Sequence, residues 1–273
     1  MLEKWRKFKA SKRGFYAFWM FLTVFFVSLG AEFVANDKPL VVYYDGQWYF
    51  PIVDNPPETV FGGEFLTPAD YKDPFVRRKI NENGFFVMPP IPYRYDTIVY
   101  DLPLPAPSAP SLKNWLGTDD LGRDVAARLI YGVRFSLLFG LLLTVCSSVI
   151  GIAAGAVQGY FGGKVDLFGQ RFLEIWGSLP QLFILIIVSG MVTAGFWPLL
   201  FVLLLFSWTA LVPVVRAEFL RVRNFDYVKA AHALGASDAR IMARHVFPNA
   251  MVATLTYLPF ILSGAVVSLT ALD

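Results

Sequence analysis

Long apolar runs separated by polar segments dominate the hydrophobic pattern of this chain. The runs are about 20 residues long or slightly longer, and they span residues 15–34, 135–157, 172–192, 196–215 and 251–272. A helix of about 20 residues is about 30 Å long, which matches the hydrocarbon thickness of a bilayer. The pattern therefore predicts an all-α polytopic membrane protein with five spans.

The charges before the first run predict which side of the membrane holds the N-terminus. Residues 1–14 carry six basic side chains and the single acid Glu3, which favours a cytoplasmic N-terminus by the positive-inside rule. A cleaved signal peptide is the alternative, but the run exceeds the usual apolar core of about 7–15 residues. Residues 33–35 also lack the A-x-A cleavage pattern. We expect an uncleaved anchor.

Alternation from a cytoplasmic N-terminus gives the topology of the remaining segments. Residues 36–134 are expected outside, and residues 158–171 and 216–249 inside. The last of these loops is rich in arginine, as the positive-inside rule requires. Five spans leave the C-terminus outside, and the sequence stops at Asp273 directly after an apolar run. We interpret this ending as a truncation.

The outer segment 36–114 is expected to form a small β-containing insert. Apolar and aromatic residues at 40–44 and 47–50 flank Asp45-Gly46. This pair tolerates the positive φ angles of a two-residue hairpin turn. The pattern therefore predicts a β-hairpin.

A proline-rich segment and an expected helix follow the insert's hairpin. Residues 103–110 contain alternating prolines and favour an extended polyproline II spacer. We prefer this interpretation to an SH3-type ligand because the segment is expected outside the cell. Residues 115–134 are predicted to form an outer amphipathic helix that leads into the second span.

Composition supports lipid as the solvent. The chain has 273 residues, 56% of them hydrophobic and only 16% charged, and its mean hydropathy is +0.51. An ordinary soluble domain is about 25% charged, so a soluble enzyme is excluded. The net charge of +3 is too small to indicate nucleic-acid binding. One cysteine and two histidines exclude a disulfide framework and make a zinc site improbable.

Near matches to two catalytic motifs fail on their required residues. Gly163-Lys164 resembles the end of a phosphate-binding loop, but Gln158 and Val165 stand where glycine and serine or threonine are needed. Residues 235–239 resemble a nucleophile elbow without its final glycine, so we interpret them as a turn. We predict that the chain is not itself an enzyme.

Three nearby carboxylates are candidates for a cation site. They are Asp119, Asp120 and Asp124. The spacings from Asp120 to Arg123 and from Asp124 to Arg128 instead favour ion pairs on a helix surface. We expect neither a metal nor another cofactor.

The five runs have no charged residue near their middles. Glu32 and Glu174 lie close to the ends of their runs and can reach an interface. Carriers coupled to protons or sodium need ionisable or unwound polar groups near the midplane. A secondary carrier or channel subunit remains the alternative, but we expect the energy for transport to come from a partner.

The second run has a face of small residues at intervals of four. These residues are Ser147, Gly151, Gly155 and Gly159. Such faces allow close helix approach in membranes, and the partner is either another permease or this same chain. Pro180 and Pro213 are expected to kink the third and fourth runs.

Two short helices are predicted in the inner loop. The first spans residues 226–234, with Asp226 or Asn224 as its cap and Gly235 at its C-terminal end in the left-handed conformation. The second spans residues 238–245, capped by Ser237, and Pro248-Asn249 closes the unit. Ala230-Ala231 is expected to be exposed for docking. The alternative is a plain amphipathic connector.

This loop resembles the EAA loop of ABC importer permeases. The resemblance is carried by Lys229-Ala-Ala-His-Ala-Leu-Gly235 through Pro248. The chain departs from the family pattern at Lys229, where glutamate is usual, and at His245, where an aliphatic residue is usual. In this family the loop docks into a cleft of the ATPase subunit. Transferred to this sequence, the resemblance implies coupling contacts at Tyr227, Lys229, Ala230, Ala231, Leu234, Gly235, Arg240, His245 and Pro248.

A second motif resembles the C-type permeases of dipeptide and oligopeptide importers. Residues 115–128 are similar to the pattern LGTD-x-x-GRD-x-x-SR, with Ala127 in place of serine. The matching residues are Gly117, Thr118, Asp119, Gly122, Arg123, Asp124 and Arg128. Residues 35–40 and 45–51 of the insert narrow the resemblance to the permease of the oligopeptide and microcin C importer.

The resemblance covers residues 115–273 and the insert, and it implies an architecture and a set of partners. The fold implied is that of an ABC type I importer permease with six spans, the sixth being absent from this sequence. The implied location is the bacterial inner membrane. Expected partners are a second permease subunit in a heterodimer, ATP-binding subunits inside, and a periplasmic peptide-binding protein. Peptide is the expected substrate, and the loop 216–249 is expected to couple ATP hydrolysis to alternating access.

Overall fold

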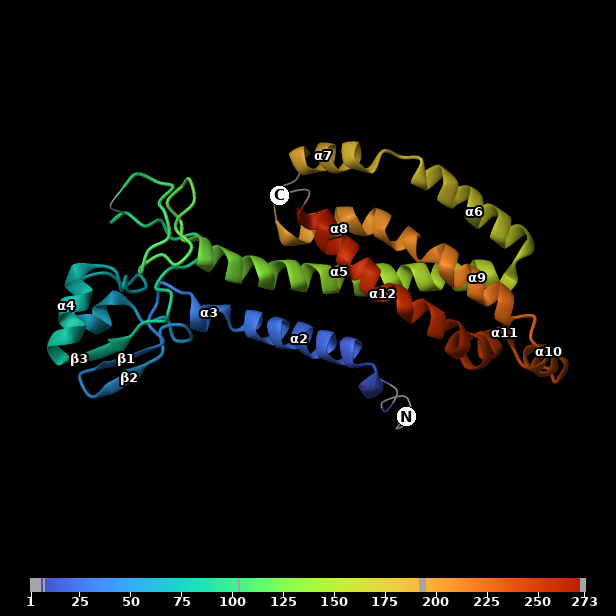
Figure 1. Cartoon of the computed structure of the whole chain (residues 1–273), viewed down its shortest axis with the longest axis horizontal. Coiled ribbons are helices and arrows are strands. Elements are labelled where there is room, and N and C mark those ends of the chain that lie inside the picture. Colours follow the sequence, from blue (N-terminus) through green and yellow to red (C-terminus); the bar gives the residue numbers. More distant parts are fainter. Residues whose placement is uncertain (1–5, 7, 103, 192–194, 271–273) are drawn as a thin grey trace. The chain divides into compact units, whose positions relative to one another are not determined.

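A computed structural model describes residues 6, 8–102, 104–191 and 195–270 of the chain (Figure 1). The chain divides into two units, Met1–Phe135 and Ser136–Asp273. Helices form most of the described elements, and the described strands all belong to the first unit. The predicted class, a helical chain with a small β-containing insert, is confirmed.

The first unit combines a long apolar helix with a small α/β insert. Its elements are α2 (Lys12–Leu29), α3 (Ala31–Val34), β1 (Val41–Tyr44), β2 (Gln47–Tyr49), the 3₁₀ helix η1 (Glu58–Phe61), α4 (Pro74–Asn83), β3 (Gly84–Val87) and the beginning of α5 (Val125–Phe161). The strands form an antiparallel sheet in the order β2-β1-β3.

The predicted hairpin is confirmed in β1 and β2. Asp45 and Gly46 have φ angles of 48° and 80°, as a two-residue turn with two left-handed positions requires. Val42 pairs with Tyr49 on one side and with Phe86 of β3 on the other. The third strand is a finding, because its four residues follow a polar helix and carry no turn signal that sequence reasoning recognised.

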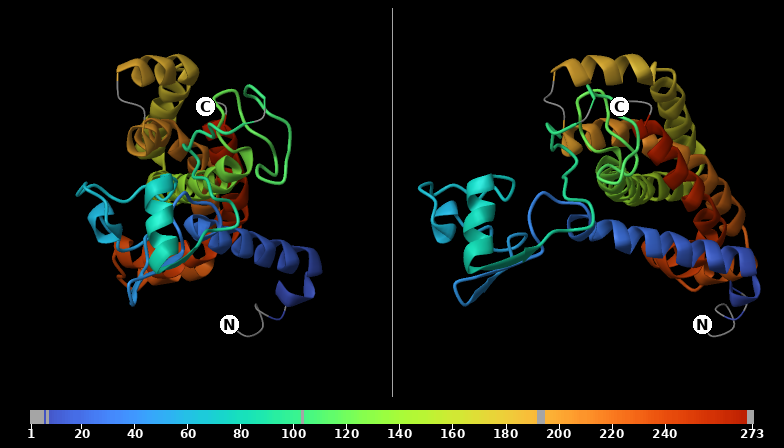
Figure 2. Two further views of the ribbon diagram at one scale, coloured as in Figure 1. Left: turned by 90° about the vertical axis from the view of Figure 1, so that its left-hand side faces the viewer. Right: turned by 60° about the vertical axis from the view of Figure 1, so that its left-hand side comes forward.

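One face of this sheet carries the core of the insert. Figure 2 shows α4 beside the strands, and its buried residues Val76 and Ile80 pack with Val42 and Phe61. Asp73 begins the helix, since its carboxylate accepts a hydrogen bond of 2.7 Å from the amide of Phe75, and Pro74 favours the first helical position. Burying each large apolar side chain stabilises the insert by about 1.5–3 kcal/mol.

The helix predicted over residues 15–34 is interrupted near its outer end. The chain leaves α2 at Gly30 and forms the single turn α3. Ala31 and Ala35 are fully buried in a cluster with Tyr131 of α5, whose hydroxyl donates to the Ala35 carbonyl at 2.9 Å. Packing of these small residues, together with the low helix propensity of glycine, outweighs continuation of the helix.

The second unit is helical throughout its described elements. It contains most of α5, followed by α6 (Gly163–Gly177), α7 (Gln181–Met191), α8 (Phe196–Ser207), the 3₁₀ turn η2 (Trp208–Ala210), α9 (Val212–Val222), α10 (Asp226–Ala233), α11 (Asp238–Ile241), the π-helical turn η3 (Met242–Val246) and α12 (Phe247–Thr270).

Three helices of the described chain are long and apolar enough to cross a membrane. They are Val125–Phe161, Phe196–Val222 and Asp238–Thr270, and they contain most of the second, fourth and fifth predicted runs. Residue 192 of the third run and residues 271–272 of the fifth lie outside the described residues. The orientation of these helices in the membrane stays a prediction.

The third apolar run is not one helix. The prediction of a helix over residues 172–192 is wrong, because its first part belongs to α6 and the remainder to α7. The chain leaves α6 after Gly177 and resumes a helix at Gln181. Pro180 lacks an amide hydrogen and disfavours helix in the residue before it, so here it separates two helices instead of kinking one. Pro213, which was also expected to kink its run, lies in the first turn of α9.

The small face of α5 packs against η2 and α9 of the same chain. A Cβ atom on Gly155 would lie 2.8 Å from both the Val212 carbonyl oxygen and the Val215 Cβ. Equivalent atoms on Gly151 and Gly159 would lie 2.5 Å from backbone oxygens of η2 and α9. Ser147, on the same face, is also buried. Of the two alternatives in the sequence, the structure favours packing within the chain.

We expect Gly155→Leu to destabilise the second unit, because α5 and α9 cannot separate to admit the side chain without losing their buried contacts. Overpacking of this kind costs about 1–3 kcal/mol. The measurement is thermal unfolding of the detergent-solubilised protein. Gly132→Leu is the matched control, since Gly132 lies on α5 and a Cβ there meets nothing within 4 Å. Equal melting temperatures for the two variants would contradict the proposed contact.

Candidate coupling site and outer-loop motif

The inner loop begins with the predicted helix pair, but its first cap differs from the prediction. Phe225, in an extended conformation, precedes α10 and makes no side-chain cap. Neither Asn224 nor Asp226 caps the helix, so that prediction is wrong. The Asn224 side chain instead donates to the Leu220 carbonyl at 2.9 Å. This gives a hydrogen-bond donor to a carbonyl in the last turn of α9.

Gly235 ends α10 as predicted. Its φ angle is 78°, its amide donates to the His232 carbonyl at 3.0 Å, and the Ala236 amide donates to the Ala231 carbonyl at 3.1 Å. This is the paired hydrogen-bond pattern of a Schellman motif. The chain then enters α11 at Asp238 after Ser237, which has an extended backbone but no side-chain cap.

The second short helix does not end before the last apolar run. The expected closure at Pro248-Asn249 is wrong, because α11, η3 and α12 form one continuous helix from Asp238 to Thr270. Pro248 lies inside this continuous helix, where it lacks an amide donor, and the π turn η3 directly precedes α12. The Asn249 side chain and the Tyr227 hydroxyl both donate to the His245 carbonyl, at 2.9 and 3.4 Å. The second short helix of the inner loop and the last apolar helix are therefore one continuous helix.

The coupling residues implied by the sequence divide into exposed and inward-facing positions. Val228 and Ile241 are buried in a core that also includes Phe219 of α9, and Ala231 packs partly against this core. Ala231 therefore differs from the prediction of an exposed Ala230-Ala231 pair, because it follows Val228 by three residues on the same helix face. His245 is half-buried. The exposed members are Tyr227, Lys229, Ala230, Leu234, Gly235, Arg240 and Pro248.

Leu234 is the most exposed large apolar side chain of this segment. It lies at the end of α10 and is 88% exposed. Lys229 and Asp226, earlier on the same helix, form only a long, exposed ion pair of 3.9 Å. Such pairs contribute little to stability. The end of α10 therefore offers an exposed apolar tip, and the charges of this helix are left to solvent.

A polar link joins the inner loop to the end of α5. The Tyr160 hydroxyl donates to Asp238 Oδ1 at 2.6 Å, and His232 Nε2 lies 3.4 Å from the same oxygen. Arg223, directly after α9, donates to the Tyr160 carbonyl at 3.0 Å. Sequence reasoning missed Tyr160, because its partner lies 78 positions away and no local pattern identifies the pair.

A second link fixes α6 to α9. Arg216 Nη2 donates to Asp166 Oδ2 at 2.6 Å, and its Nε contacts the other carboxylate oxygen. The hydrogen bonds from Arg216 lower the pKa of Asp166, so this carboxylate stays ionised. A two-pronged guanidinium contact of this kind restricts direction as well as distance.

The outer motif is a folded turn instead of a helix. The helix predicted over residues 115–134 is wrong in its first part, because α5 begins only at Val125. Gly117 and Gly122 both have φ angles of 76°, a left-handed conformation that interrupts a helix. A Cβ on Gly117 would lie 2.3 Å from the Ser108 carbonyl oxygen. The Thr118 amide donates to that oxygen at 3.0 Å.

Asp119 organises this turn through hydrogen bonds. Its carboxylate accepts from the amides of Leu121 and Arg123 at 3.0 and 2.8 Å and from Arg123 Nε at 2.8 Å, and it also contacts Arg128. Partial burial acts to raise the pKa of Asp119, but the hydrogen bonds and charge of Arg123 outweigh it and hold that pKa below its usual range.

Asp124 begins α5. It is fully buried, its Oδ1 accepts from the Ala127 amide at 2.8 Å, and its Oδ2 accepts from Asn114 Nδ2 at 2.8 Å. A carboxylate bonded to the amide three residues later is a helix N-cap, worth about 1 kcal/mol. The predicted surface pairs from Asp124 to Arg128 and from Asp120 to Arg123 are wrong, because Asp119 binds both arginines.

A metal ion has no evident ligand set in the described residues. No group of three histidine, cysteine, aspartate or glutamate side chains in that part of the chain is arranged to hold one. The motif carboxylates Asp119 and Asp124 instead direct their oxygens to backbone and side-chain donors. The motif as a whole therefore positions the N-terminal end of α5.

Comparison with known proteins identifies the class of transporter. Residues 125–273 match the family model described as "binding-protein-dependent transport system inner membrane component". The match covers more than half of the chain, and the chain therefore belongs to this family of inner-membrane permease subunits.

Two relatives resemble the chain over almost its whole length. The inner membrane ABC transporter permease protein YejE of Escherichia coli is 54% identical over 99% of this chain and 79% of its own length. The peptidoglycan transport system permease protein YejE of Agrobacterium fabrum is 51% identical over 99% of this chain and 77% of its own length. The dipeptide transport system permease protein DppC of Bacillus subtilis is 33% identical over 58% of this chain and 49% of its own length.

A solved structure resembles part of the chain. It is described as an amino acid ABC transporter with histidines, and it is 18% identical, covering 50% of this chain and 70% of its own, with a TM-score of 0.38.

We expect Tyr160→Phe to loosen the inner loop, because the variant loses only the hydroxyl that donates to Asp238. Amide hydrogen exchange over residues 226–246 should become faster, since local opening no longer breaks this bond. Tyr257→Phe is the control, because Tyr257 is exposed on α12 and its hydroxyl makes no hydrogen bond within the described chain. Unchanged exchange in Tyr160→Phe would show that the link does not restrain the loop.

We expect the stability provided by Asp119 to depend on pH. Its pKa is lowered in the folded chain, so the contribution is complete above the unfolded value of about 3.9 and is lost as pH falls through the folded value. Asp119→Asn should therefore melt below the wild type at pH 7, and the difference should shrink near pH 3. The exposed Asp120→Asn is the control. A difference that persists unchanged at pH 3 would contradict an ionic role.

Proposed function

We propose that this chain is the permease subunit of an ATP-driven peptide importer and forms half of its translocation pathway. The family assignment over residues 125–273 carries this proposal. Support for peptide as the substrate class comes from the relatives named for peptidoglycan and dipeptide transport. Oligopeptides and peptide antibiotics of the microcin C type are the proposed range. No observation favours the alternative of a secondary carrier or channel.

The proposed assembly contains several other chains. A second permease completes the pathway, ATP-binding subunits dock on the inner face, and a periplasmic binding protein delivers peptide. The family description names dependence on a binding protein and an inner-membrane location, which supports these partners. ATP hydrolysis then occurs on the ATP-binding subunits, and this chain converts their motion into access.

The proposed topology places the N-terminus and residues 216–249 in the cytoplasm and residues 36–114 in the periplasm. The basic residues before α2 and the arginines of the inner loop support this orientation. The outer-motif turn then lies on the periplasmic side, where it sets the entrance of α5 into the membrane.

Coupling follows from the continuity of the inner loop with α12. A displacement of α10 and α11 by the ATPase is carried along the unbroken helix Asp238–Thr270. The bond from Tyr160 to Asp238 carries the same displacement to α5. Because α5 contacts α9 through its glycine face, the three helices respond together. This arrangement supports rigid-body alternation between inward and outward access.

The function is tested by uptake in proteoliposomes that contain this chain, the second permease, the ATP-binding subunits and the binding protein. We expect uptake of a labelled tripeptide that requires ATP on the side of the membrane that holds the ATP-binding subunits. This uptake should persist when the proton and sodium gradients are collapsed. Uptake that follows an ion gradient without ATP would instead establish a secondary carrier.

We expect Leu234→Asp to weaken the ATPase contact. The substitution places a charge at the exposed apolar tip of α10, and an unpaired charge in a packed interface is strongly unfavourable. The tip makes few contacts within the chain, so folding should be unaffected. Co-purification of the ATP-binding subunit should fall at least about tenfold, which corresponds to about 1.4 kcal/mol, and uptake should fall with it.

The control for this variant is Leu66→Asp, which changes a leucine of similar exposure, 85%, in the outer insert. It should retain ATPase association. If Leu234→Asp also retains full association and uptake, the ATPase binds elsewhere and the loop is a connector.

A further inference from the structure

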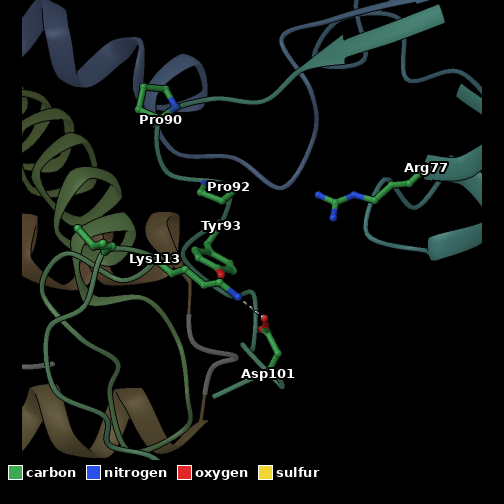
Figure 3. A pocket seen from close by; sticks show the side chains of 7 residues that line it. Arg77, Pro90, Pro92, Tyr93, Asp101 and Lys113 are labelled. Atoms are coloured by element: carbon green, nitrogen blue, oxygen red, sulfur yellow. Dashed lines mark hydrogen bonds and ion pairs between the residues drawn. The ribbon is translucent and has the colours of Figure 1, made fainter. Parts of the chain in front are cut away.

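An open pocket of about 400 Å³ lies in the first unit, and its lining residues all fall within residues 77–113. Figure 3 shows the side chains that line it. Arg77 comes from α4, and the other lining residues come from the segments that lead from β3 to the outer motif: Pro90, Pro92, Tyr93, Asp101, Leu112 and Lys113. The volume lies within the range of about 300–1,000 Å³ that is common for small-ligand sites.

The guanidinium of Arg77 is positioned for an external anion. Its Nε donates to the Tyr71 carbonyl at 2.9 Å, and its Cζ lies 5.7 Å from the ring centre of Phe86. These contacts use one donor and fix the side chain. The terminal nitrogens have no carboxylate partner in the described chain, and in Figure 3 they point towards Pro92 and Tyr93.

Charges of both signs surround the Tyr93 ring: Lys113 and Arg77 act to lower its pKa, and Asp101 and Asp124 act to raise it. Lys72 Nζ lies 4.9 Å from the centre of this ring, and burial is the main cause that lowers the pKa of Lys72. Lys113 forms an exposed ion pair of 3.1 Å with Asp101, so it neutralises the one carboxylate that lines the pocket. Burial raises the pKa of Tyr93, so its phenol stays neutral.

The remaining wall is apolar. Pro90 and Pro92 add rigid rings, and Tyr93 and Leu112 add a flat aromatic and an aliphatic surface. Prolines lose little conformational entropy when a ligand binds, because their backbones are already restricted. The site thus pairs a fixed guanidinium fork with a preformed hydrophobic surface.

We propose that this pocket binds the C-terminal carboxylate of a short peptide. The terminal nitrogens of Arg77 donate to the two carboxylate oxygens, a geometry that the planar guanidinium matches better than an ammonium does. The side chain of the last residue packs on Tyr93 and the prolines. The assignment of a peptide as the carboxylate ligand rests on the proposed function, and it gives the insert a role in holding substrate before entry.

The experiment measures binding by the full chain in lipid nanodiscs with isothermal titration calorimetry. The probes are the tripeptide Ala-Ala-Leu and its C-terminal amide. We expect the free acid to bind at least about tenfold more tightly than the amide, because the amide loses the charge-assisted hydrogen bonds. Raising the salt concentration should weaken the free acid more than the amide, since only the acid has a carboxylate whose attraction to Arg77 is screened.

The matched variants are Arg77→Gln and Arg78→Gln. Both remove one positive charge from an exposed position of α4, but only Arg77 lines the pocket. Arg77→Gln should reduce the affinity for the free acid to that of the amide, whereas Arg78→Gln should bind like the wild type. Equal melting temperatures establish that both variants fold.

Three outcomes would overturn the proposal. Equal binding of the acid and the amide would exclude carboxylate recognition, and equal affinities for Arg77→Gln and wild type would exclude this pocket. Binding of the periplasmic binding protein that needs Arg77, without any binding of the free tripeptide, would make the pocket a protein contact. Failure of the uptake experiment in the wild type would instead refute the proposed function, and the calorimetric result distinguishes the two failures.

Discussion

Direct backbone contact between α5 and α9 is the constraint on which the second unit depends. Three glycines on one face of α5 lie so close to η2 and α9 that no Cβ atom fits between them. Because nothing compressible separates the two helices, neither can shift far without the other. This contact places Val215 and Phe219 in the core that α12 and the inner loop share. It also brings Arg216 and Arg223 to their partners, Asp166 and the Tyr160 carbonyl.

Both ends of α5 are held by polar contacts of different kinds. At the N-terminal end, Asp124 is buried and bonded to backbone and Asn114, so its removal would leave unpaired donors. At the C-terminal end, Tyr160 binds Asp238 in a more exposed environment. A buried, fully paired carboxylate resists rearrangement more than an exposed hydroxyl link does. The contacts at the outer motif therefore hold the N-terminal end of α5 more rigidly than the Tyr160 hydrogen bond holds its C-terminal end.

The sequence predicted most elements whose signal is local. The hairpin at Asp45-Gly46 and the left-handed end of α10 at Gly235 both depend on backbone conformations that few residues tolerate. The apolar runs located three of the long helices. The break at Gly30 and the split at Pro180 were missed or misjudged, because run length alone does not show where tertiary packing ends a helix.

The polar contacts of the site were much less predictable. Local spacing suggested helix pairs for Asp120 and Asp124, whereas Asp119 binds both arginines across a turn. Ala231 faces inward because α10 has its own buried side, which a motif match does not reveal. The link from Tyr160 to Asp238 joins positions far apart in sequence. Only the three-dimensional arrangement identifies such pairs.

The proposed coupling requires the inner loop and α12 to move as one rigid body. Double electron–electron resonance tests it with spin labels on cysteines at Ala239 and Leu255, in a Cys146→Ala background within the assembled transporter. An unbroken helix of 16 residues between them gives about 24 Å. We predict a narrow distribution at this distance both without nucleotide and after trapping with ATP and vanadate. A distance that changes or broadens between the two states would show that the helix bends at η3, and it would contradict rigid coupling.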